Sequence, residues 1–123
     1  MTMRIDAPSS TLLLLAGALG ITGVGLAAAA SHLGDDHLLG NAAQMCLAHA
    51  PALVGIVAAG ARLRTGLAAG LLIGLGTALF AGDLVYRHFQ GSGLFPMAAP
   101  SGGMAMMAGW LAVGIGAFVK PRT

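Results

Sequence analysis

The sequence predicts an all-α integral membrane protein, a four-helix bundle whose consecutive helices run up and down. Apolar residues make up 57% of the chain and charged residues 8%, whereas soluble domains carry about 25% charged residues. The mean hydropathy of +0.86 favours lipid over water as the solvent. The apolar residues fall into four stretches, each close to the ~20 residues that cross a bilayer. The connections are short, which favours antiparallel neighbours, and residues 1–123 suffice for one domain.

The first predicted span covers residues 11–30 and follows Arg4. A basic residue, an apolar run and the small residues "AAAAS" are also features of a secretory signal peptide. The apolar run is longer than the ~7–15 residues typical of such a signal. Cleavage near Ala30 would also leave a polar new N-terminus. We therefore expect this span to remain as a membrane helix.

The second predicted span covers residues 38–60 and is the least regular, because it contains polar residues and a proline. Pro51 lacks a backbone N–H and should kink the helix near its middle. Membrane helices tolerate such a kink when neighbours cover the freed carbonyl groups. The polar residues of this span are Asn41, Gln44 and His49.

The third and fourth predicted spans cover residues 66–86 and 102–119. In the third, a small residue recurs every four positions, which keeps these residues on one helical face and lets a neighbouring backbone approach. That neighbour can belong to this chain or to another protein, and Gly74→Leu should break the assembly. Shorter repeats with the same spacing are Ala16–Gly20 and Ala105–Gly109. The small residues of the third span are Gly66, Gly70, Gly74, Ala78 and Gly82.

The basic residues predict the orientation of the bundle. With an even number of spans, both ends of the chain and the middle connection share one side of the membrane. That side holds every basic residue except Arg87, so the positive-inside rule predicts that both termini are cytoplasmic, an N-in, C-in topology. Six basic residues are also too few for a nucleic-acid interface. The residues of the predicted cytoplasmic side are Arg4, Arg62, Arg64, Lys120 and Arg122.

The stretch "SHLGDDH" forms the predicted outer connection between the first two spans. Its members His32, Asp36 and His37 are residue types that bind metals. A helix-borne pair of histidine ligands sits at i and i+4, whereas these histidines are separated by a glycine-containing turn. Asp35 and Asp36 directly precede the second span, where a carboxylate caps free N–H groups. We therefore expect capping, with no metal and no cofactor.

Polar residues within predicted spans are candidates for function, because burying them in lipid is costly. His49 is the deepest, with Gln44 nearby. Three interpretations stay open for His49: an interhelical hydrogen bond, part of a substrate or proton path, or a haem ligand paired with His32. Against the third, His32 and His49 are expected at different depths in the membrane. Asp83 and Arg87 lie at i and i+4, acid first, and are expected to form an ion pair.

Four motifs, taken together and in order, resemble one family of small membrane proteins. They are "AAAASHL" in the first span, the Gln-x-x-x-x-His spacing of the second, "LFAGDL" in the third and "APSGGMAMMAGW" in the fourth. The set is similar to the domain-of-unknown-function 423 family, which is related to transmembrane protein 256. The family-matching positions are His32, Gln44, His49, Pro100, Gly102, Gly103, Gly109 and Trp110.

The resemblance implies a four-helix protein of the bacterial inner (plasma) membrane that keeps its first helix. It implies no activity. The sequence also departs from the family pattern: alanines replace the two glycines before His32, and Asp83 stands where a serine is expected.

The sequence contains no recognisable catalytic constellation, nucleophile elbow or phosphate loop, so nothing in it supports an enzyme. Its small size and small-residue face favour an accessory or interaction subunit of a larger membrane complex. The expected partners are the lipid bilayer and a membrane protein or further copies of this chain, with no nucleic acid. The first alternative is a small transporter or channel component that uses His49. The second is a metal- or haem-binding subunit.

Overall fold

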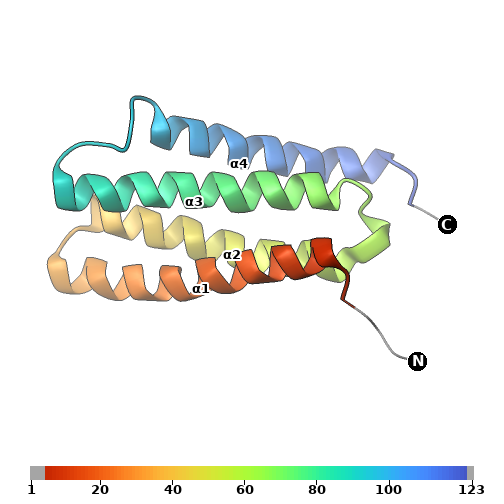
Figure 1. The fold of residues 1–123 in the computed structure, drawn as a ribbon, viewed down its shortest axis with the longest axis horizontal. Coiled ribbons are helices and arrows are strands. Elements are labelled where there is room, and N and C mark those ends of the chain that lie inside the picture. The colour runs from red at the N-terminus through yellow and green to blue at the C-terminus, as the bar shows by residue number, and fades with distance from the viewer. Residues whose placement is uncertain (1–4, 122–123) are drawn as a thin grey trace.

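The computed structural model describes residues 5–121 and consists of four long helices joined by short connections (Figure 1). The helices are α1 (Ala7–Leu33), α2 (Asn41–Ala59), α3 (Gly66–Gln90) and α4 (Ala98–Ile115). A π-helical turn at Asp36–Gly40 leads into α2, and 3-10 turns at Gly60–Arg62 and Gly116–Phe118 follow α2 and α4. No strand occurs among residues 5–121, so the predicted all-α class is confirmed.

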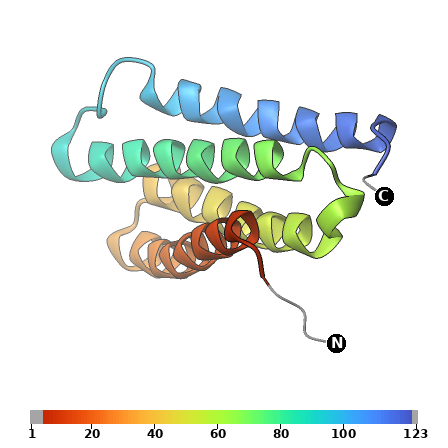
Figure 2. The ribbon, with the colours of Figure 1, turned by 45° about the vertical axis from the view of Figure 1, so that its right-hand side comes forward.

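Consecutive helices run antiparallel (Figures 1 and 2). α1 packs mainly on α2, α4 packs mainly on α3, and α2 joins the two pairs by packing on α3. The start of α1, the α2–α3 connection and the end of α4 lie at one end of the bundle, which we call the basic end. The α1–α2 turn and the α3–α4 loop lie at the other, which we call the histidine end because His37 and His88 are there.

All four helices are long and apolar enough to cross a membrane. Counting their flanking turns, the spans are Ala7–Leu33, Asp36–Arg62, Gly66–Gln90 and Ala98–Phe118. Their length and composition indicate a multi-pass membrane protein.

Helix caps and prolines explain where α1 and α4 begin. The Asp6 carboxylate accepts a hydrogen bond of 2.9 Å from the Ser9 amide, and Pro8 occupies the first turn of α1. α4 begins at Ala98 rather than at residue 102, with Pro100 in its first turn. Proline is tolerated there because the first N–H groups of a helix have no partner inside the helix. α2 continues through Pro51 without interruption.

Glycines hold α3 and α4 at backbone contact. A Cβ built at Gly102 would lie 2.7 Å from both the Gly76 carbonyl oxygen and the Phe80 nitrogen. One at Gly109 would lie 2.9 Å from the Ala69 carbonyl oxygen. Such close approach is a common basis of helix association in lipid. Gly76 was absent from the predicted small-residue face, because it lies off the four-residue repeat.

The predicted small-residue face of α3 is filled from within the chain over part of its length. A Cβ added at Gly70 would meet Leu12 of α1 at 2.7 Å, and one at Gly74 would meet Leu15 at 2.9 Å. A Cβ at Gly82 would meet nothing within 4 Å. The same face therefore packs against α1 near the basic end and is open near the histidine end.

Candidate functional site

His49 lies buried near the middle of α2 and links α2 to α4 by a hydrogen bond. Its Nδ1 is 2.7 Å from the Met45 carbonyl oxygen one turn earlier. Its Nε2 accepts a bond of 3.1 Å from the indole N–H of Trp110 in α4. A carbonyl only accepts and an indole N–H only donates, so the ring carries its proton on Nδ1. Both ring nitrogens are therefore occupied by partners within the protein.

Asp83 is fully buried in the last third of α3 and holds the loop that leads to α4. Its Oδ1 accepts a bond of 2.7 Å from the Leu94 amide, and its Oδ2 lies 3.4 Å from the Arg87 guanidinium. Gly93 allows the loop to approach, since a Cβ there would lie 2.7 Å from Asp83 Oδ1. A serine has one oxygen, whereas this carboxylate uses one oxygen for the loop and the other for Arg87.

Asp35 links the α1–α2 turn to α3. Its Oδ1 accepts a bond of 2.9 Å from the Leu38 amide, which is the expected helix cap. Its Oδ2 lies 2.5 Å from Nδ1 of His88, near the end of α3. The Leu38 amide lowers the pKa of the Asp35 carboxyl, and the His88 hydrogen bond lowers it further, against a smaller opposing effect of desolvation.

Sequence reasoning did not find His88. The available signal was its position in the last turn of the third span, at the same end of the bundle as Asp35. The two residues are far apart in the sequence, and periodicity does not give the register between separate helices. The contact between Asp35 and His88 could therefore not be predicted.

The three candidate metal ligands of the α1–α2 turn do not form a metal site in the part of the chain that the structure describes. His32, Asp36 and His37 are all exposed around the α1–α2 turn. Within residues 5–121, no three His, Cys, Asp or Glu side chains are close enough to hold a metal ion.

Gln44 and Asp36 line a polar hollow of about 460 Å³ between α1 and α2, which we call the Gln44 hollow. Its remaining wall includes Ser31 and the alanines Ala27 and Ala30. Gln44 is exposed, and its amide makes no hydrogen bond with any residue in 5–121. The hollow therefore presents several hydrogen-bonding groups on the outer surface of the bundle, near the histidine end.

The residues that the motif resemblance singled out have several different settings in the fold. His49 and Trp110 are bonded to each other, and Gly102 and Gly109 touch the α3 backbone. Pro100 occupies the first turn of α4, and a Cβ on Gly103 would meet nothing within 4 Å. His32 and Gln44 are exposed.

Comparison of the chain with curated proteins and with solved structures gave no match. A family model described as "Protein of unknown function (DUF423)" matches residues 16–103. This range runs from α1 through the first turns of α4, and so includes the Gln44 hollow and His49. The chain therefore belongs to the DUF423 family.

Proposed function

We propose that this protein is an accessory subunit of a larger assembly in the bacterial inner membrane, and that it binds a partner membrane protein through the Gln44 hollow. The observation that carries the proposal is a contrast between interior and surface. The buried polar side chains are satisfied within the chain, whereas Gln44 presents an unpaired amide on the surface.

The length of its span supports a position for Gln44 below the membrane surface. The span Asp36–Arg62 has 27 residues, so at 1.5 Å per residue it is about 40 Å long, or roughly 10 Å longer than the hydrocarbon core. If the extra length is shared equally, about 5 Å of the span lies outside the hydrocarbon core at each end. Gln44 is about 12 Å along the helix from Asp36, so it lies inside the core. An unpaired amide at this depth costs about 1–3 kcal/mol, and a polar group on a neighbouring helix would remove that cost.

The hydrogen bonding of the buried polar side chains supports a transporter or channel less well than an accessory subunit. The buried polar side chains are His49, Thr77 and Asp83, and each makes hydrogen bonds inside the chain. No buried side-chain nitrogen or oxygen within residues 5–121 lacks a partner. A path for a polar substrate would need interior groups free to bind it.

A haem- or metal-binding subunit is also less well supported. Ligation by His49 would require one of its two ring nitrogens to leave Met45 or Trp110. His32, the other ligand considered, is exposed at the histidine end of α1.

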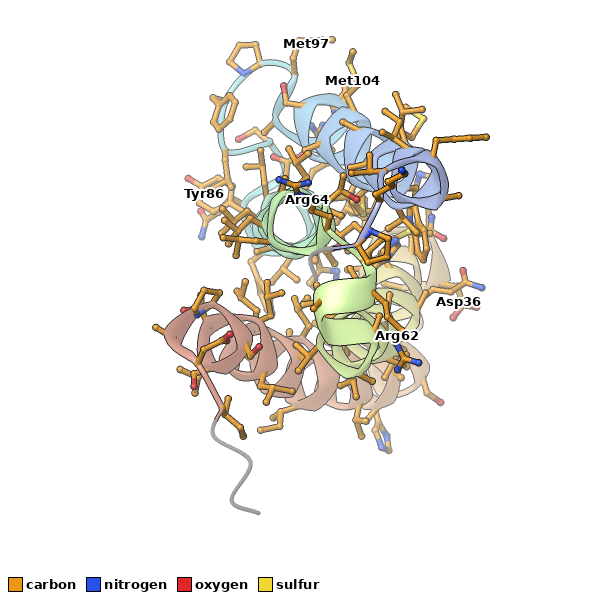
Figure 3. The ribbon with its side chains drawn as sticks, turned by 90° about the vertical axis from the view of Figure 1, so that its right-hand side faces the viewer. Asp36, Arg62, Arg64, Tyr86, Met97 and Met104 are labelled. Carbon is orange, nitrogen blue, oxygen red and sulfur yellow. The ribbon has the colours of Figure 1, made fainter. Side chains whose placement is uncertain are left out.

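The proposed orientation places the basic end in the cytoplasm. Figure 3 looks onto this end, where Arg62 and Arg64 lie near the viewer. Lys120 follows α4 at the same end, while Arg4 and Arg122 fall outside the described residues. At the histidine end, Arg87 is paired with Asp83. The positive-inside rule then supports cytoplasmic termini.

The test is purification of the tagged protein from its own membranes in a mild detergent, followed by mass spectrometry of the intact complex. We expect a stoichiometric partner with the wild type, and its loss with Gln44→Leu. Asn41→Leu is the control, because Asn41 is exposed on the same helix but does not line the hollow, and this variant should retain the partner. Recovery of the wild type alone, or only as a homo-oligomer, would contradict the accessory role.

A further inference from the structure

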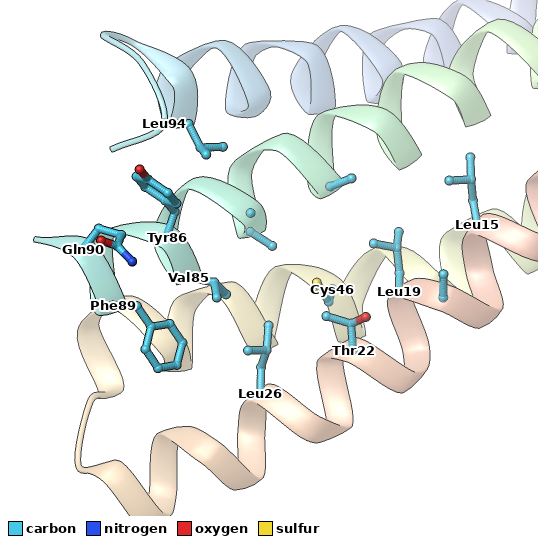
Figure 4. A pocket seen from close by; sticks show the side chains of 14 residues that line it. Leu15, Leu19, Thr22, Leu26, Cys46, Val85, Tyr86, Phe89, Gln90 and Leu94 are labelled. Carbon is cyan, nitrogen blue, oxygen red and sulfur yellow. The ribbon is translucent and has the colours of Figure 1, made fainter. Parts of the chain in front are cut away.

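A second hollow lies on the opposite flank, between α1 and α3, and we call it the α1–α3 groove (Figure 4). It begins where the α1 leucines stop filling the small-residue face of α3. Leu15 still covers Gly74, but Gly82 is uncovered. The open space beyond has a volume of about 780 Å³, within the ~300–1,000 Å³ typical of ligand sites.

The groove is apolar along its length and polar at one end. Leu19, Thr22 and Leu26 of α1 form one wall, and Val85 of α3 forms part of the other. Cys46 of α2 lies at its floor. Apart from Thr22, Cys46 and the aromatic ring of Phe89, the lining side chains along this length are aliphatic.

Tyr86 and Gln90 line the groove at the histidine end (Figure 4). Neither the Tyr86 hydroxyl nor the Gln90 amide makes a hydrogen bond with any residue in 5–121, and both are exposed. Each can donate a hydrogen bond. The groove thus presents two available donors at the level where the helices reach the membrane surface.

We propose that the α1–α3 groove binds one acyl tail of a membrane phospholipid, whose ester carbonyl accepts hydrogen bonds from Tyr86 and Gln90. The distribution of polarity supports this occupant. A phospholipid places an apolar tail beside carbonyl acceptors at the interface, and the groove places an apolar wall beside donors at the helix ends. Its open side faces the bilayer, which supplies the lipid.

The chemistry of the groove favours a lipid tail over a helix of another protein. Lipid tails are as apolar as leucine, so an apolar groove gains little by exchanging a tail for a helix unless polar contacts are added. The Gln44 hollow has such groups along its wall, whereas the polar groups of the α1–α3 groove, Tyr86 and Gln90, lie only at its end. The two lie apart, since Asp36 and Tyr86 project from opposite flanks of the bundle (Figure 3). This inference therefore goes beyond the proposed accessory role and does not depend on it.

The test is photocrosslinking with a phosphatidylcholine that carries a diazirine in its acyl tail. The protein is reconstituted in vesicles of phosphatidylethanolamine and phosphatidylglycerol that contain this probe, and the adducts are located by mass spectrometry. We expect adducts to concentrate on groove residues such as Leu19 and Val85. The reference surface is the exposed face of α4 at Met104, Met107 and Leu111, each 65% exposed.

Gly82→Leu should fill the groove and reduce its adducts several-fold, while adducts on α4 stay unchanged. Gly25→Leu is the matched control: a Cβ at either glycine meets nothing within 4 Å, but Gly25 does not line the groove. If Gly82→Leu does not fold, the double variant Tyr86→Phe, Gln90→Leu provides a second test. It should lower the number of phospholipids that stay bound to the detergent-purified protein in native mass spectrometry.

Two results would overturn the proposal. Adducts spread over all faces in proportion to exposure, and unchanged by Gly82→Leu, would show that the groove is ordinary lipid-facing surface. A dimer whose groove residues form no adducts would show that a second copy of the chain occupies the groove.

Discussion

The imidazole of His49 is held in one tautomer by two partners that cannot exchange roles. Met45 offers only a carbonyl acceptor and Trp110 only an N–H donor. The pair links α2 to α4, which otherwise pack through α3. This arrangement supports the interhelical hydrogen bond as the role of His49, among the three interpretations that the sequence left open.

Trp110→Phe should destabilise the protein, because it leaves Nε2 of His49 without its donor while keeping an aromatic ring. Interhelical hydrogen bonds in membranes contribute about 0.6 kcal/mol on average and up to about 1.7 kcal/mol. A double-mutant cycle with His49→Ala, measured by unfolding in detergent, should give a coupling energy in this range. Purely additive losses would mean that the bond contributes nothing to stability.

The pH dependence of stability should depend on Asp35. Folding lowers the pKa of its carboxyl through the Leu38 amide and then His88, so the folded state favours the ionised form. The resulting stabilisation is complete above the unfolded pKa of about 4 and is lost as the pH falls through the lower folded value. Thermal unfolding measured across this acid range should show the loss in the wild type.

Asp35→Asn should weaken this acid dependence, because the amide does not titrate. Asp36→Asn is the comparison variant: it changes the neighbouring, exposed carboxylate and leaves the Asp35–His88 hydrogen bond in place. Identical acid profiles for the wild type and Asp35→Asn would contradict the assignment.

At the scale of elements, α3 has two different packing faces. One face takes leucine side chains of α1 at Gly70 and Gly74, and the other takes the backbone of α4 at Gly76. A leucine end can move when a methyl group is added, but a backbone atom cannot move without shifting its helix. The α3–α4 contact is therefore the less tolerant of the two.

Gly102→Ala should destabilise the bundle, because its Cβ would lie 2.7 Å from backbone atoms of α3. The cost of such overpacking is about 1–3 kcal/mol or more. Gly103→Ala is the matched control at the next position, where a Cβ meets nothing within 4 Å and stability should not fall. The midpoint of thermal unfolding in detergent compares the two, and equal midpoints would contradict close backbone contact.

At the scale of the whole molecule, charge is distributed unequally between the two ends. Arg62, Arg64 and Lys120 are at the basic end, and the histidine end has Arg87 in an ion pair with Asp83. This distribution predicts that the α3–α4 loop faces the periplasm and the α2–α3 connection faces the cytoplasm.

Single cysteines introduced in a Cys46→Ala background can test this orientation with a thiol reagent that does not cross membranes. Ser92→Cys, in the α3–α4 loop, should react in cells whose inner membrane is intact. Ala61→Cys, in the α2–α3 connection, should react only after that membrane is permeabilised. The reverse pattern would mean that the termini face the periplasm.

The sequence by itself determined the number and class of the helices, because apolar runs near the thickness of a bilayer have few structural alternatives. It also placed Asp83 and Arg87 within reach of each other, since i and i+4 are neighbours on any helix. The family followed from short motifs kept in order along the chain.

Only the tertiary structure decided which side chains meet across helices. It joined His49 to Trp110 and Asp35 to His88, and it brought Gly76, which lies off the four-residue repeat, against Gly102. It also divided the small-residue face of α3 into a part that α1 covers and a part that is open. The physical reason is that periodicity defines the faces of one helix, whereas the rotation and register between two helices depend on how their side chains pack.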